Sequence, residues 1–152
     1  WNGQTETLED QIRRSNQQTM HGREMSDPQV TALAAYVRTL DLPRSVDALR
    51  GTQVEKLVTR GKEIFHARDC TSCHTPPLYT SADAYDVGLT DKQGNKHFNP
   101  PSLRGISHRG PHFHGVGERT LQSVFTEHGH QLDGKSLSND ELKALVAFLR
   151  SL

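Results

Sequence analysis

Both cysteines of the chain fall in one short stretch, ARDCTSCHTPP, in which a histidine directly follows the second cysteine. The order Cys-x-x-Cys-His, here Cys70, Cys73 and His74, is the signature of covalent haem attachment, in which the thiols form thioethers with the two vinyl groups and the imidazole ligates the iron. A redox dithiol, a structural disulfide and half of a zinc site are the alternatives. A dithiol would follow a strand of a βαβ unit, whose Val/Ile runs are missing, and a zinc site would need further ligands at regular spacing. The motif therefore predicts one covalent haem c.

An iron held by His74 has a second axial position, on the opposite face of the porphyrin. Methionine commonly fills it in c-type haems, but the only methionines, Met20 and Met25, lie before the haem motif. Histidine is the available substitute, although a lone histidine in a loop is more often a surface or hydrogen-bonding residue. The candidates are His66, His97, His108, His112, His114, His128 and His130.

Helical periodicity dominates the segments that must hold this site. Apolar residues recur three and four positions apart just before the haem motif and again at the end of the sequence. We expect a helix near residues 53–66 to cross a helix near residues 139–151. Gly61 offers a place without a side chain at the crossing, and Phe65 and Phe148 are the bulky residues that can meet around it.

The segment between these helices reads as a long ordered loop. Residues 75–119 contain five prolines and a scatter of Gly, Asp and Asn. Loops of this length usually need something to wrap around, and a haem would serve. Together with the two helices, this predicts an all-α protein with the cytochrome c fold and long haem-wrapping loops.

Composition limits the other possibilities. The 152 residues contain 18 basic and 18 acidic side chains, so the balance gives no reason to expect binding to nucleic acid. No apolar run approaches the ~18 residues that a membrane span requires. The sequence begins at Trp1 without a basic and apolar leader, which suggests a processed or shortened chain. Because thioether attachment of haem takes place outside the bacterial cytoplasm, we expect a periplasmic location.

The first forty residues resemble the last forty. The segment SDPQVTALAAYVRTL, residues 26–40, aligns with SNDELKALVAFLRSL, residues 138–152, and ETLEDQI further upstream answers ERTLQSVF. The matched pairs are Ser26/Ser138, Ala32/Ala144, Leu33/Leu145, Ala35/Ala147, Arg38/Arg150 and Leu40/Leu152. The alternative is a chance similarity of two amphipathic helices.

The repeat predicts a domain organisation, because one copy lacks a haem motif. Residues 1–45 would be the C-terminal remnant of a preceding cytochrome c-like domain, and residues 50–152 a complete mono-haem cytochrome c domain. The stretch DLPRS, residues 41–45, would be the linker. An apolar face through Leu33, Tyr36, Val37 and Leu40 would then meet an absent partner, the second domain or a second copy of the chain.

Several motifs in order give a family resemblance. These are GKEIFHARDCTSCH, FNPPSLRGISHRGPHFHG, ERTLQSVFTEHGH and LSNDELKALVAFLRSL. Residues 54–152 resemble the C-terminal haem domain of the bacterial di-haem cytochrome c peroxidases and their methylamine-utilisation (MauG-like) relatives. The resemblance implies that the intact protein has two haem domains, of which the missing N-terminal one meets hydrogen peroxide. The C-terminal haem would accept electrons from a small donor protein, a cytochrome c or a cupredoxin.

The resemblance also implies roles for single residues. The family motif Phe-x-x-Pro-Ser-Leu-Arg falls on Phe98, Pro101, Ser102, Leu103 and Arg104. The carbonyl of Pro101 would accept the Nδ1 proton of the proximal imidazole and fix the ring. Arg104 would pair with a haem propionate, for which a planar guanidinium is a matched partner; the alternative is a solvated arginine.

The family often binds calcium near a Pro-Tyr-Phe-His-Asp-Gly stretch, which is altered here. His112 replaces the tyrosine, and Gly115 and Val116 replace Asp-Gly. A calcium ion is therefore a doubtful expectation for this chain.

The family register selects one histidine for the second axial position. In the family the ligand methionine falls eight residues after the Thr of a Thr-Leu pair, directly before a glycine. Counting from Thr120 leads to His128, which Gly129 follows. We therefore expect His74 and His128 to be the two iron ligands, with His130 and His114 as the next candidates.

Three functions fit these observations. Electron transfer through a six-coordinate haem is the first, a peroxidase or other redox catalyst at this haem is the second, and a haem-based sensor is the third. They differ in the spin state of the iron and in the binding of carbon monoxide. The substrate of the intact protein stays open, because the resembling family includes members that oxidise protein side chains.

Overall fold

The computed structural model describes residues 3, 5–113, 117, 120–130, 132 and 134–152. The chain divides into two compact units, a smaller one over residues 3–42 and a larger one that starts at Pro43. The boundary falls inside the stretch DLPRS. Helices account for most of the regular structure, and the expectation of an all-α protein needs one amendment, a short two-stranded hairpin.

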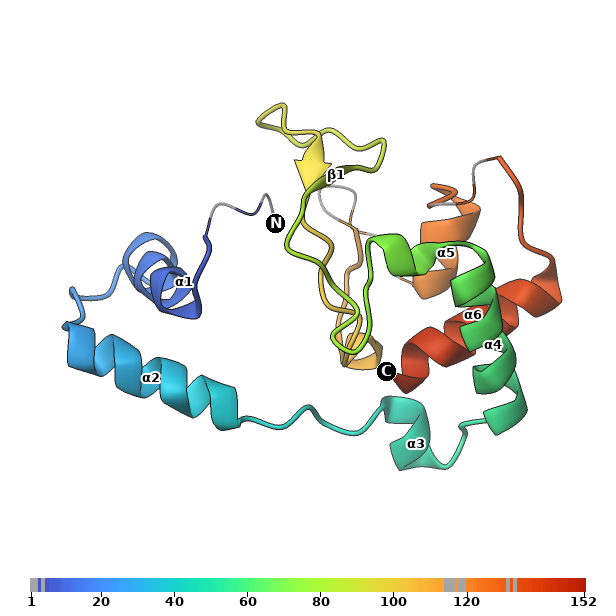
Figure 1. Cartoon of the computed structure of the whole chain (residues 1–152), viewed down its shortest axis with the longest axis horizontal. Helices are drawn as coiled ribbons and strands as arrows, with labels where there is room; N and C mark the ends of the chain where they lie inside the picture. The colour runs from blue at the N-terminus through green and yellow to red at the C-terminus, as the bar shows by residue number, and fades with distance from the viewer. Residues whose placement is uncertain (1–2, 4, 114–116, 118–119, 131, 133) are drawn as a thin grey trace. The chain divides into compact units, whose positions relative to one another are not determined.

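The larger unit is built on two crossing helices, α4 (Glu55–Ala67) and α6 (Asn139–Ser151), which lie side by side in Figure 1. A Cβ atom placed on Gly61 would lie 2.0 Å from the carbonyl oxygen of Ala144 and 2.6 Å from Cβ of Phe148. The rings of Phe65 and Phe148 meet edge to face with centroids 5.3 Å apart. The predicted crossing is therefore confirmed, and Gly61 lies at its closest point.

The remaining helical elements of the larger unit are short. They are α3 (Val46–Arg50), the 3₁₀ turns η2 (Cys70–Ser72) and η3 (Ile106–His108), and α5 (Leu121–Thr126). Arg150 on α6 binds the carboxylate of Asp47 on α3 with two hydrogen bonds, each 2.6 Å long. Thus α3 is fastened to the end of α6.

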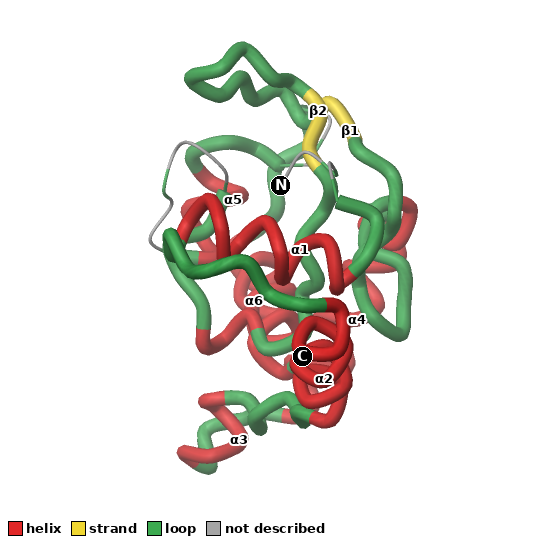
Figure 2. The backbone as a smooth tube through the Cα atoms, turned by 90° about the vertical axis from the view of Figure 1, so that its left-hand side faces the viewer, coloured by secondary structure: helices red, strands yellow, loops and turns green. Residues whose placement is uncertain are grey.

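A hairpin interrupts the long loop before η3. Strands β1 (Tyr85–Asp86) and β2 (His97–Phe98) pair antiparallel, as Figure 2 shows. At its tip, the backbone N–H of Gly94 donates to the carbonyl of Asp91 (3.0 Å), and that of Asp91 donates to Asn95 (3.0 Å).

Below the strands, the two arms of the loop are joined by hydrogen bonds that we call the neck, formed between residues 78–83 and 99–103. The Ser102 hydroxyl donates to the carbonyl of Leu78 (2.6 Å), and the backbone N–H of Leu103 donates to that of Tyr79 (3.1 Å). The side-chain amide of Asn99 donates to the carbonyls of Ser81 and Asp83. The neck thus closes the loop before the hairpin begins.

The helices of the smaller unit resemble the last two helices of the larger unit in order and in capping. It contains α1 (Leu8–Arg14), the π-helical turn η1 (Ser15–Thr19) and α2 (Asp27–Thr39). Serines with capping boxes begin both α2 and α6, and threonines cap both α1 and α5. Arg38 pairs with Glu9 through two hydrogen bonds of 2.7 and 3.1 Å, which fastens α2 to α1.

The apolar face of α2 is largely uncovered. Val30 and Ala34 are buried, but Tyr36 is 61% exposed and Val37 is 37% exposed. The aligned residues Phe148 and Leu149 of α6 are both buried in the core of the larger unit. Among the residues that the structure describes, no helix is long and apolar enough to cross a lipid bilayer.

Candidate haem site

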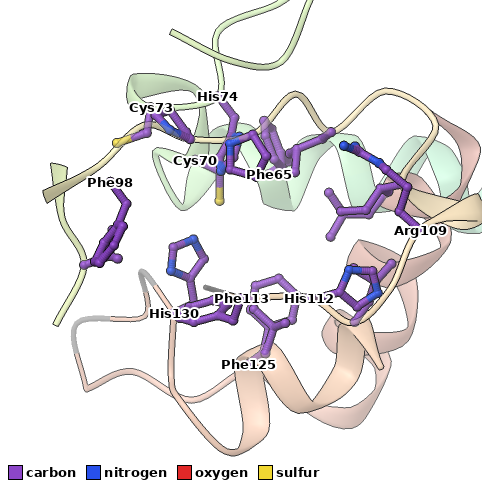
Figure 3. A pocket seen from close by; sticks show the side chains of 18 of the residues that line it. Phe65, Cys70, Cys73, His74, Phe98, Arg109, His112, Phe113, Phe125 and His130 are labelled. Carbon is purple, nitrogen blue, oxygen red and sulfur yellow. The ribbon is translucent and has the colours of Figure 1, made fainter. Parts of the chain in front are cut away.

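A cavity of about 480 Å³ opens between the haem motif, the long loop and the helices α5 and α6. Figure 3 shows Cys70 and His74 on one side, with Phe113, Phe125 and His130 facing them. The walls are mainly apolar, and the volume lies in the range of pockets that hold cofactors. Further wall residues are Val87, Leu89, Phe98, Leu103, Ile106, Leu121, Val124, Leu145 and Leu149.

The haem motif begins where α4 ends. Asp69 adopts a left-handed conformation (φ 53°), and Cys70 then starts the turn η2, so that the backbone N–H of His74 donates to the carbonyl of Cys70 (2.9 Å). Both thiols line the cavity and neither forms a disulfide. Burial raises the pKa of the Cys70 thiol to about 11. The structure therefore does not support the alternative that Cys70 and Cys73 form a structural disulfide.

His74 is held by backbone carbonyls. Its Nδ1 donates to the carbonyl of Tyr79 over 3.0 Å, which leaves Nε2 as the nitrogen for a metal. Burial lowers the pKa of His74, and hydrogen bonding to the carbonyls of Tyr79 and Pro101 opposes the shift. The family resemblance assigned the orienting hydrogen bond to the carbonyl of Pro101. It did not indicate Tyr79, which is closer to His74 in sequence.

Tyr79 is itself fixed by the core. Its ring packs against Phe65 and Phe148 with centroids 5.9 and 6.1 Å apart, and its backbone has φ 53°, an uncommon value for a residue with a bulky side chain. The core therefore holds the carbonyl that orients His74, an arrangement typical of groups that support metal ligands.

His130 faces the haem motif across the cavity. Its imidazole lines the cavity (Figure 3), and burial lowers its pKa to about 4, with His74 as the second cause. A neutral imidazole is the form that ligates metals. His130 packs edge to face on Phe113, with centroids 5.0 Å apart.

His128, the residue that the family register selects, lies elsewhere in the structure. It is exposed, stacks on Phe113 with centroids 5.4 Å apart, and is not among the residues lining the cavity. The two histidines flank Gly129, which turns the chain with φ 57°. The assignment of His128 therefore rests on the register alone, whereas the geometry favours His130. His114, the third candidate, falls outside the described residues.

Arg104 and Arg109 also differ in whether their side chains line the cavity. Both residues are exposed, but the side chain of Arg109 lines the cavity and that of Arg104 does not. Nη2 of Arg109 donates to the carbonyl of Ser102, and also to that of Arg104 over 3.1 Å. His112 lines the cavity as well, and its pKa is lowered by burial and then by Arg109. Sequence reasoning did not single out Arg109, because the family motif ends at Arg104.

Within the described part of the chain, no cluster of three or more His, Cys, Asp or Glu side chains is arranged to hold a metal ion. Of the altered stretch that raised the question of calcium, residues 114–116 lie outside that part. The structure therefore does not test the expectation about calcium.

The residues of the cavity fit a covalently attached haem. Two free thiols and an oriented imidazole lie together on one wall, a second imidazole lies opposite, and apolar side chains fill the space between. These are the donors and walls that a c-type haem requires.

Comparisons with known proteins agree with this site. The family model "Cytochrome c" matches residues 58–152. The chain is 26% identical over 148 residues to the cytochrome c551 peroxidase of Nitrosomonas europaea, covering 80% of this chain and 43% of that protein. It is 28% identical over 125 residues to the methylamine utilization protein MauG of Methylophilus methylotrophus, covering 65% of this chain and 37% of that protein. The chain thus spans less than half the length of these curated relatives.

A solved structure of Kuenenia stuttgartiensis hydrazine synthase, pressurised with xenon, superposes with a TM-score of 0.72. It shares 23% identity, and the match covers 93% of this chain and 60% of that chain. At this identity the likeness concerns the fold. The family match covers the haem motif and most of both crossing helices, and it shows that the chain belongs to the cytochrome c family.

Proposed function

We propose that this chain transfers electrons through one covalently bound c-type haem with two histidine ligands. The observation that carries the proposal is the placement of His74 and His130 on facing walls of one cavity, beside both thiols. The haem supplies the one-electron chemistry when bound. Cys70 and Cys73 would hold it, the apolar walls would exclude water, and His74 and His130 would ligate the iron.

A histidine on the second face suits a relay better than a peroxide site. Peroxide chemistry requires an open position on the iron, and two imidazoles leave none. Imidazole also favours the ferric state more than a thioether does, so the potential would be lower than with methionine ligation. The sequence offers methionine only at Met20 and Met25, both in the smaller unit.

The ligands can be tested by spectroscopy of two variants of the holoprotein. We expect the parent to be low-spin, His130→Ala to become high-spin, and exogenous imidazole to restore the parent bands. His128→Ala is the matched control and should stay low-spin. The reverse pattern would return the ligand to His128, as the register predicts. A high-spin parent would favour a peroxidase or another catalyst at this haem, and carbon monoxide binding to a low-spin ferrous parent would favour a sensor.

For the intact protein, we propose a di-haem peroxidase-like enzyme in which this domain accepts electrons from a small donor protein, a cytochrome c or a cupredoxin, in the periplasm. The support is the similarity to the two relatives, which the chain matches over less than half of their length. Which substrate the enzyme would act on, hydrogen peroxide or a protein side chain, is left to assay. The mass and haem content of the full gene product would test the proposal: two haems support it, and a single haem contradicts it.

The smaller unit supports the same proposal. Its helix α2 matches α6 in sequence and capping, yet the positions that α6 buries against α4 and the cavity are exposed on α2. We therefore interpret residues 1–45 as the end of a preceding cytochrome c-like domain. The exposed face would be covered by the counterpart of α4 in that domain, or by a second copy of this chain when the counterpart is missing.

A further inference from the structure

We infer that Arg109, and not Arg104, binds a haem propionate in this cavity, with His112 beside it. The inference rests on the proposed haem and adds the residue that meets its anionic edge. It begins from the chemistry of attachment. In a haem, the two vinyl groups and the two propionates lie on opposite edges of the porphyrin, so thioethers to Cys70 and Cys73 direct the propionates to the far end of the cavity.

Arg109 lies at that far end. In Figure 3, Cys73 and Phe98 lie at one end of the cavity and Arg109 and His112 at the other. Asp69 and Arg109 are the two residues with formal charges among the described lining residues, and Asp69 belongs to the thiol end, directly before Cys70. The propionate end is therefore basic and has no lining carboxylate among the residues described.

A propionate needs such a partner here. The walls are mainly apolar, and a carboxylate removed from water is strongly destabilised unless a cation and hydrogen bonds compensate. A guanidinium is always charged and holds its hydrogen-bond donors in a fixed plane, so it suits a carboxylate partner.

The side chain of Arg109 is held in position before any ligand binds. Its Nη2 donates to the carbonyls of Ser102 and Arg104 at the start of the turn η3. Those bonds use Nη2, so Nε and Nη1, which lie on different edges of the guanidinium, can each donate a single hydrogen bond to a propionate oxygen. None of the ion pairs formed by the described residues involves Arg109. Arg104, in contrast, contributes its carbonyl to this arrangement, and its side chain does not line the cavity.

The test compares Arg109→Gln with Arg104→Gln in the holoprotein. A positive charge near the porphyrin stabilises the ferrous state, which carries one positive charge less than the ferric state. We therefore expect Arg109→Gln to lower the midpoint potential and to shift the propionate-bending band in the resonance Raman spectrum. Arg104→Gln should leave the Raman band in place and change the potential much less.

Arg109→Lys separates charge from geometry and provides a second variant if the glutamine variant does not fold. It should keep the potential close to that of the parent but still shift the propionate band, since an ammonium cannot reproduce the planar donor geometry of the guanidinium. Parent-like propionate bands in the Arg109 variants, or a shift confined to Arg104→Gln, would overturn the inference. If the pyridine haemochrome spectrum of the parent lacked thioether-bound haem, the proposed function would fail instead, and the inference with it.

Discussion

Replacing Gly61 by alanine should destabilise the larger unit, although alanine is the better helix former. The new Cβ would lie 2.0 Å from the carbonyl oxygen of Ala144 and 2.6 Å from Cβ of Phe148, distances at which neighbouring atoms must move. One contact is with backbone of α6, so a change of side-chain rotamer cannot relieve it. The crossing of α4 and α6 must open.

The expected magnitude follows from two opposing effects. Inserting a methyl group into a packed core typically costs about 1–3 kcal/mol, and a contact with backbone belongs at the upper end. Replacing glycine by alanine in a helix returns roughly 1 kcal/mol. The net loss in the free energy of unfolding is then about 2 kcal/mol, equivalent to a fall in Tm of roughly 8 °C for a unit of this size.

The assay is unfolding of the holoprotein by heat and by urea, followed by circular dichroism. Thr59→Ala, at an exposed position of the same helix, is the matched control and should be neutral or slightly stabilising. Gly61→Leu should be less stable than Gly61→Ala. If Gly61→Ala proved as stable as Thr59→Ala, the close crossing would be wrong and the reasoning with it.

Two further predictions concern the attachments of the larger unit. Arg150 holds the pKa of Asp47 below its ordinary value of 3.8, so the pair stabilises the fold above that pH, and the contribution disappears as the pH falls through the lowered pKa. Asp47→Asn should therefore lower the free energy of unfolding by about 1 kcal/mol at pH 7 and by progressively less in acid. Glu63→Gln, which removes an exposed ion pair, is the control and should change the free energy of unfolding little. An equal loss at every pH would contradict the role of the charge. A chain shortened to residues 43–152 should keep its haem and its helical circular dichroism signal. It should self-associate less than the full chain in sedimentation experiments, because it lacks the exposed face of α2. Loss of haem would show that the smaller unit is required.

The haem motif and the two crossing helices were predictable, because the sequence patterns that indicate them are local. The haem motif specifies its own chemistry, the apolar spacing within each segment predicted the two helices, and Gly61 indicated the point where they cross. These features depend on residues a few positions apart, for which helical geometry determines which side chains share a face.

The choice between His128 and His130 could not be made in this way. Counting residues gives a position along the chain, but these two histidines flank Gly129, whose backbone is left-handed (φ 57°). Which imidazole enters the cavity depends on that turn and on the packing of Phe113, a residue distant in sequence. Periodicity contains no information on either.

Arg109 was missed for a related reason. The family motif draws attention to Arg104, whereas the turn η3 brings the later arginine to the cavity and uses the carbonyl of the earlier one to hold it. Likewise, the carbonyl that orients His74 comes from Tyr79, and its position depends on tertiary contacts with two phenylalanines.

The neck below the hairpin makes the loop tip a site for insertion. Because hydrogen bonds close the loop at residues 78–83 and 99–103, added residues between Lys92 and Gln93 would lengthen a segment whose ends are already held together. Doubling the length of such a loop costs only about 0.6 kcal/mol in closure entropy. A peptide epitope or an anchoring tag could therefore be grafted at this tip, which would orient the domain on an electrode while leaving the walls of the haem cavity in place.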